Sequence, residues 1–95
     1  MIWNNNTQES EETEVLVDTD TGSAIILYND DVNTFDHVIY CLIKYCKHTE
    51  EQAEQCATLV HYKGKCTVKS GSEIVLIPIC ETLTEKGLSA VLEEL

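Results

Sequence analysis

The sequence predicts one α+β domain in which a three-stranded sheet carries three helices on one face. Two observations lead to this fold class. Residues 23–92 alternate between strand and helix patterns in the order strand, helix, helix, strand, helix, strand. The 95 residues, of which 43% are hydrophobic, are enough for one modest core and not for two. We therefore expect a core domain over residues 23–95, preceded by an extension over residues 1–22.

The extension is rich in Asn, Thr and Glu and carries six acidic residues but no basic one. Such a composition cannot bury enough apolar surface to offset the entropy lost on ordering, so we expect a disordered acidic arm. The only parts of the extension able to bind a partner are Trp3 and the run Val15-Leu16-Val17.

The first strand is predicted over residues 23–28, SAIILY, a short continuous apolar run of the kind found in buried central strands. Gly22 and the polar cluster Asn29-Asp30-Asp31 bound it. Asn33 or Thr34 can then cap a helix. Its apolar positions follow the i, i+3, i+4 spacing and are Phe35, Val38, Ile39, Leu42, Ile43 and Cys46.

A second helix is predicted to begin at the capping box Thr49-Glu50-Glu51-Gln52 and to end at Gly64. One face of this helix carries the apolar residues Ala53, Cys56, Ala57 and Val60. The next segment, residues 65–70, alternates in the manner of a half-buried strand.

The third helix is predicted to open at Gly71-Ser72 and to close at Gly87, and the last strand to cover residues 88–92. Pro78 lies inside this helical pattern and removes one backbone hydrogen bond. We expect the helix either to begin just before Pro78 or to kink there.

The formal net charge of −11, with 17 Asp and Glu against 6 Lys and no Arg, leaves no basic stripe for phosphates. The charge therefore disfavours nucleic acids and acidic membrane surfaces as partners. No apolar run approaches the ~20 residues that span a bilayer, and the amino terminus lacks a secretory leader pattern, so we expect a cytoplasmic protein.

The five cysteines are widely spaced, odd in number and free of any CxxC motif. This pattern argues against a zinc site and against a disulfide framework. Four of them fall in apolar patterns, where a reduced thiol acts as a small hydrophobe. No nucleophile motif surrounds them, so we expect no enzyme, no metal and no cofactor.

Two polar clusters end apolar segments: Asn29-Asp30-Asp31 after the first strand, and residues 61–65, HYKGK, after the second helix. Each has an ordinary structural explanation as a turn or a helix end. If the two helices form a hairpin, however, His61 can face Asn29. Carboxylate, amide and neutral imidazole acceptors would then hold a protonated amine through charge-assisted hydrogen bonds of roughly 1.5–3 kcal/mol each.

The sequence resembles the ClpS family of adaptor proteins, whose fold is similar to that of the carboxy-terminal domain of ribosomal stalk proteins. Four segments carry the resemblance: residues 27–31 (LYNDD), 34–38 (TFDHV), 53–55 (AEQ) and 60–65 (VHYKGK). The resemblance implies an adaptor that binds the free amino terminus of N-degron proteins with a large apolar first residue, Leu, Phe, Tyr or Trp, and delivers them for degradation.

By matching position, the resemblance implies that Asn29, Asp31 and His61 hold the α-amino group and that Asp30 shapes the same turn. It implies a hydrophobic pocket lined by Leu27, Asn33, Phe35, Val38, Ala57, Val60 and Leu88. The sequence departs from the common family pattern at Val32-Asn33-Thr34-Phe35, where the family often has Tyr-Thr-Pro-Met, and at Ala57, where Met is frequent. We expect aromatic and Leu termini still to bind.

The implied partner is a hexameric AAA+ Clp unfoldase, engaged through a ClpA-like or ClpC-like N-terminal domain, with the acidic arm needed for hand-over of the cargo. We expect the adaptor to be a monomer. Two alternatives stay open: an enzyme that brings His61, Asp31 and a thiol together, and a non-catalytic interaction domain of stalk-protein-like fold without amine recognition.

Overall fold

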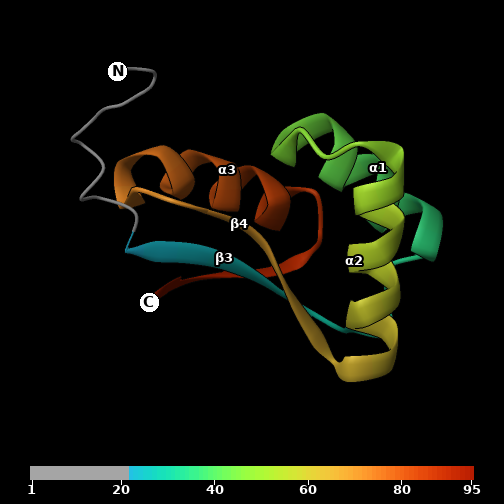
Figure 1. The fold of residues 1–95 in the computed structure, drawn as a ribbon. Coiled ribbons are helices and arrows are strands. Elements are labelled where there is room, and N and C mark those ends of the chain that lie inside the picture. The colour runs from blue at the N-terminus through green and yellow to red at the C-terminus, as the bar shows by residue number, and fades with distance from the viewer. Residues whose placement is uncertain (1–21) are drawn as a thin grey trace, which may run out of the picture.

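The computed structural model describes residues 22–95 (Figure 1). The elements in this range are β3 (Ser23–Tyr28), α1 (Phe35–Cys46), α2 (Glu50–Lys63), β4 (Lys65–Gly71), α3 (Glu73–Glu85) and β5 (Ser89–Glu94). The predicted α+β class and the predicted order of elements are confirmed. The acidic extension predicted over residues 1–22 lies outside the described residues, apart from Gly22.

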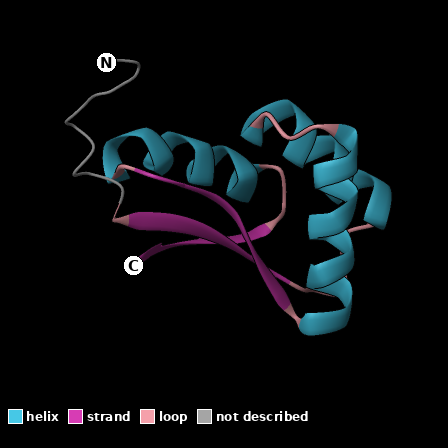
Figure 2. Ribbon diagram, viewed as in Figure 1, coloured by secondary structure: helices cyan, strands magenta, loops and turns pink. Residues whose placement is uncertain are grey.

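The sheet has the strand order β4-β3-β5, and both neighbours of β3 run antiparallel to it (Figure 2). Tyr28, the last residue of β3, pairs with Lys65 on one side and with Ser89 on the other. The end of β3 therefore lies beside the beginnings of both β4 and β5. The pairing with β4 skips Val68, which forms a bulge and is buried.

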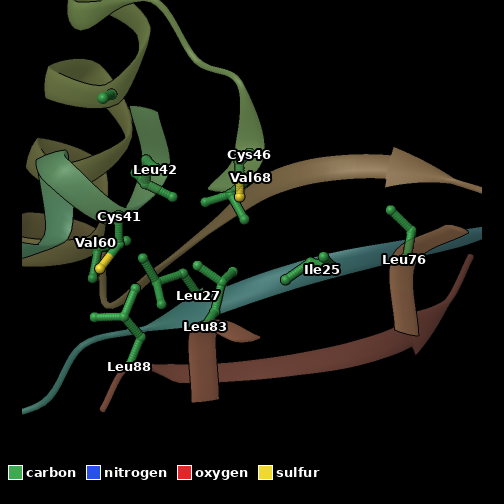
Figure 3. Close-up of a cluster of buried hydrophobic side chains, with 11 residues drawn as sticks. Ile25, Leu27, Cys41, Leu42, Cys46, Val60, Val68, Leu76, Leu83 and Leu88 are labelled. Atoms are coloured by element: carbon green, nitrogen blue, oxygen red, sulfur yellow. The ribbon is translucent and has the colours of Figure 1, made fainter. Parts of the chain in front are cut away.

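One hydrophobic core joins the sheet to all three helices (Figure 3). Ile25 and Leu27 point to the same face of β3 because they are two residues apart, and both are fully buried. The helices cover that face with buried side chains of α1 (Cys41, Leu42, Cys46), α2 (Ala53, Val60) and α3 (Leu76, Leu83). The predicted packing of the helices on one face is thus confirmed.

Capping residues set the ends of α1 and α2 as predicted. Thr34, rather than Asn33, caps α1, and its Oγ1 accepts a hydrogen bond from the backbone N–H of His37 at 3.1 Å. Both bonds of the predicted capping box are present between Thr49 and Gln52. Gly64 ends α2 with a φ of 93°, a left-handed conformation that glycine adopts without strain.

α3 begins at Glu73 with Ser72 as its N-cap residue, as Gly71-Ser72 predicted. It does not begin just before Pro78, which lies inside the helix, five residues after its first residue. The proline leaves the carbonyl of Ile74 without its usual helical partner. Because Ile74 and Pro78 are both exposed, water can reach this carbonyl.

No helix among residues 22–95 has the length and apolarity needed to cross a membrane.

Candidate functional site

The candidate site lies where β3 ends against the end of α2. The backbone N–H of Asn29 donates a hydrogen bond to the carbonyl of Gly64 at 2.9 Å. This contact continues the register of the sheet, in which Tyr28 pairs with Lys65. The antiparallel pairing of β3 with β4 thus places the polar cluster after β3 beside the last turn of α2, which carries His61.

An open cavity of about 650 Å³ lies at this junction. Its lining residues are Asn29, Asp30, Asn33, Phe35, Val38, Ala57, Thr58, Val60, His61 and Tyr62. A narrow cavity of about 20 Å³ shares part of this lining and adds the buried side chains of Leu27 and Leu88. Apart from Asp31, all the residues predicted for the amine site and the hydrophobic pocket line one cavity or both.

The carboxylate of Asp30 organises the turn that follows β3. Its Oδ1 accepts the backbone N–H groups of Val32 and Asn33, both at 2.9 Å. Its Oδ2 accepts the Asn33 side-chain amide at 2.8 Å and the Ser89 hydroxyl at 2.9 Å. These bonds, the backbone N–H of Asn33 first among them, lower the pKa of Asp30 to about 2. A carboxylate has about four accepting positions, and here all are used.

The side chain of Asn33 ties the same turn to the loop before β5. Its Nδ2 donates to Asp30 and also to the carbonyl of Gly87, at 2.8 Å in each case. Gly87 has a φ of 93°, and a Cβ built there would lie 3.6 Å from Asn33 Oδ1. Asn33 therefore lines the cavities as a fixed polar wall.

The side chains of Asn29, Asp31 and His61 make fewer hydrogen bonds than those of Asp30 and Asn33. Within residues 22–95, no hydrogen bond of the Asn29, Asp31 or His61 side chain is found, and all three residues are exposed. The ring of His61 makes an edge contact with Tyr62 at a centroid distance of 4.8 Å. The structure thus brings Asn29 and His61 into one cavity and leaves Asp31 on the adjoining turn, outside both linings.

Two lining residues, Thr58 and Tyr62, were not expected from the sequence. Thr58 donates its hydroxyl proton to the carbonyl of Glu54 at 2.8 Å, and the side chain of Tyr62 is 77% exposed. Helical spacing was the available signal. His61 and Tyr62 lie three and four residues after Thr58, so both share the side of α2 that carries Thr58.

All five cysteines of the described chain are buried or half-buried and have free thiols. Cys41 Sγ lies 3.7 Å from His37 Nε2, but Cys41 is fully buried and burial raises the pKa of its thiol. Burial also raises the pKa of Cys46 to about 11 and that of Cys56 to about 12. None of the five thiols lines either cavity. Residues 22–95 contain no group of three or more side chains placed to hold a metal ion.

The chain is similar in sequence to proteins of a known family. A sequence model of the family described as ATP-dependent Clp protease adaptor protein ClpS matches residues 18–91. A relative in Thermosynechococcus vestitus, the ATP-dependent Clp protease adapter protein ClpS, is 38% identical over 66 residues, 68% of this chain and 70% of that protein. The protein of the same name in Streptomyces coelicolor is 28% identical over 88 residues, 93% of this chain and 92% of that protein.

A solved structure shares the fold. Agrobacterium tumefaciens ClpS2 bound to L-phenylalaninamide superposes with a TM-score of 0.76, at 17% sequence identity, over 80% of this chain and 99% of that one.

Proposed function

Because the chain belongs to the ClpS family of Clp protease adaptor proteins, we propose that it binds the free α-amino group and the large hydrophobic first side chain of N-degron proteins. In this proposal it delivers them to a Clp AAA+ unfoldase for degradation. The observation that carries the proposal is the cavity between β3, α1 and α2, where polar acceptors stand beside an apolar floor.

The α-amino group is assigned to Asn29, Asp31 and His61. An ammonium group is a hydrogen-bond donor, whereas an amide oxygen, a carboxylate and a neutral imidazole nitrogen all accept. In this proposal the side chain of Asp31, which is exposed and lies on the adjoining turn, turns toward the cavity when the amine binds. Asp30 acts differently, since its four accepting positions are already used: it holds the turn and adds negative charge near the amine.

The first side chain of the cargo is assigned to the apolar part of the cavity. Leu27, Val60 and Leu88 form its buried floor, and Figure 3 shows these three side chains lying in the same part of the core. The walls are Asn33, Phe35, Val38 and Ala57. Burying a Leu or Phe side chain here contributes about 1.5–3 kcal/mol. The relative from Agrobacterium, which is bound to L-phenylalaninamide, accommodates a free amine with an aromatic side chain in the same fold.

The partner that receives the cargo is assigned as a Clp unfoldase with a ClpA-like or ClpC-like N-terminal domain, consistent with the family. The acidic arm over residues 1–22 takes part in hand-over, and the adaptor works as a cytoplasmic monomer without a catalytic step. The raised pKa of Cys46 and of Cys56 supports this last point, because a protonated thiol is a poor nucleophile at neutral pH.

The test is fluorescence anisotropy with a peptide that begins with Phe, compared with the same peptide acetylated at its amino group. We expect only the free-amine peptide to bind. Asp31→Ala and His61→Ala should each weaken its binding at least tenfold, about 1.4 kcal/mol, with unchanged circular dichroism. Equal binding of the free and acetylated peptides would instead favour an interaction domain of the same fold without amine recognition.

A further inference from the structure

The α2 wall of the cavity carries a small side chain. Ala57 lies on this wall, is 3% exposed, and has only a methyl group as its side chain. A cavity of about 650 Å³ is within the ~300–1,000 Å³ range of small-molecule sites. A small first side chain such as Leu would leave part of this space without van der Waals partners. A bicyclic side chain would fill more of it.

Aromatic side chains stand at the mouth of the same cavity. Phe35 at the start of α1 is 46% exposed, and Tyr62 in the last turn of α2 is 77% exposed. Aromatic rings attract one another in offset-stacked or edge-to-face arrangements beyond what their buried area contributes. An incoming aromatic ring therefore finds partners here that an aliphatic side chain does not use.

Thr58 supplies a hydrogen-bond acceptor on the α2 wall. Its hydroxyl donates its single proton to the carbonyl of Glu54 at 2.8 Å, which leaves the oxygen lone pairs for another donor. Of the first residues expected, Leu and Phe have no side-chain donor, and Tyr has a donor on a single ring that is smaller than the bicyclic indole. The indole N–H of Trp is a donor only.

We propose that the site selects cargo whose first residue is Trp, with the indole ring beside Phe35, over Ala57, and its N–H directed to Thr58 Oγ1. This proposal rests on the proposed function, since it names the side-chain class that the same cavity takes.

The test uses the full chain and four peptides that differ only in their first residue: Trp, 1-methyltryptophan, Phe and Leu. We expect the Trp peptide to bind most tightly. Methylation of the indole nitrogen and the substitution Thr58→Val should each weaken Trp binding by about threefold to tenfold, the range of one hydrogen bond. Thr58→Val should weaken the Leu peptide less than the Trp peptide, because Leu has no side-chain donor for the Thr58 hydroxyl.

Thr84→Val is the matched control. Thr84 makes the same bond to a carbonyl four residues earlier, that of Cys80, at 2.9 Å on α3, and it lines neither cavity. This variant should leave all four affinities unchanged. Ala57→Leu should weaken the Trp peptide more than the Leu peptide, because it narrows the cavity. If the Ala57→Leu variant does not fold, because Ala57 is buried, Thr58→Val and the methylated peptide still test whether the indole N–H binds Thr58.

Two kinds of failure are distinguishable. Equal or tighter binding of the Leu or Phe peptide, or Trp binding unaffected by both Thr58→Val and indole methylation, would overturn the Trp inference and leave amine recognition intact. No binding of any free-amine peptide, or equal binding of acetylated ones, would overturn the proposed function itself.

Discussion

Asp30 and Asp31 are neighbours in sequence but have different surroundings. Asp30 accepts four hydrogen bonds from three residues, whereas the Asp31 side chain makes none within the described chain and is exposed. The first carboxylate builds the turn, and the second remains available to a ligand. Two adjacent substitutions should therefore separate stability from binding.

Asp30→Ala should lower the free energy of unfolding by about 2 kcal/mol, because it leaves the donors of Asn33 and Ser89 without their partner. Asp31→Ala should change it by less than about 0.5 kcal/mol, as expected for an exposed side chain. Urea denaturation at pH 7 measures both. Equal destabilisation by the two substitutions would contradict the division of roles.

The depressed pKa of Asp30 also fixes the pH range of its effect. The folded-state pKa of about 2 lies below the ordinary value of 3.8, so ionised Asp30 stabilises the fold above about pH 4. That contribution is lost as the pH falls towards 2. The difference in unfolding free energy between wild type and Asp30→Ala should therefore shrink between pH 4 and pH 2. A difference that stays constant over this range would refute the assignment.

The thiols provide a further test at the level of single residues. With a pKa of about 11 for Cys46 and about 12 for Cys56, both are protonated at pH 7.5 and should react slowly with iodoacetamide in the native protein. In urea, where the burial is lost, they should react at the ordinary rate. Mass spectrometry measures the labelling. A thiol that reacts fast in the native protein, and whose alkylation abolishes the function of the protein, would favour the enzyme alternative instead.

At the level of elements, the ends of α1 and α2 could be predicted because single residues determine them. Each end depends on a local hydrogen bond or backbone conformation that the residue type itself predicts. The residues are Thr34, the pair Thr49 and Gln52, and Gly64. The strand order and the bulge at Val68 could not be predicted, because an apolar run does not say which strand lies next to it.

The same distinction applies to the candidate site. From the sequence, His61 was expected to face Asn29 if the two helices form a hairpin. In the structure, the register of β3 with β4 brings Asn29 and His61 together. Thr58 could not be predicted, because the apolar pattern of α2 identifies only its core face and Thr58 is exposed. The orientation of Asp31, outside both cavity linings, depends on how Asp30 folds the turn.

The capping box of α2 leads to a prediction about this element, which carries Ala57, Val60 and His61. Thr49→Ala should lower the free energy of unfolding by about 1 kcal/mol. Ser72→Ala is the control, since Ser72 occupies the same position before α3 but its side chain makes no capping bond. Thermal and urea unfolding compare the two variants. A loss for Ser72→Ala as large as that for Thr49→Ala would contradict the capping explanation.

At the level of the whole molecule, recognition and delivery should be separable. The cavity is built from residues 27–88, whereas the acidic arm precedes the described fold. Deletion of residues 1–20 should leave peptide affinity unchanged and stop degradation of delivered cargo by a Clp unfoldase and its peptidase. Peptide binding and cargo turnover are measured side by side, and full turnover with the deletion variant would refute a role of the arm in hand-over.

The most direct test of the account is a two-dimensional NMR titration of the ¹⁵N-labelled protein with a free-amine peptide that begins with an aromatic residue. We expect the largest shifts at the Asn29 side-chain amide, the backbone amide of Asp31 and the ring of His61, and none with the acetylated peptide. Shifts confined to another surface, or identical shifts with both peptides, would contradict the claim that this cavity reads a free amino terminus.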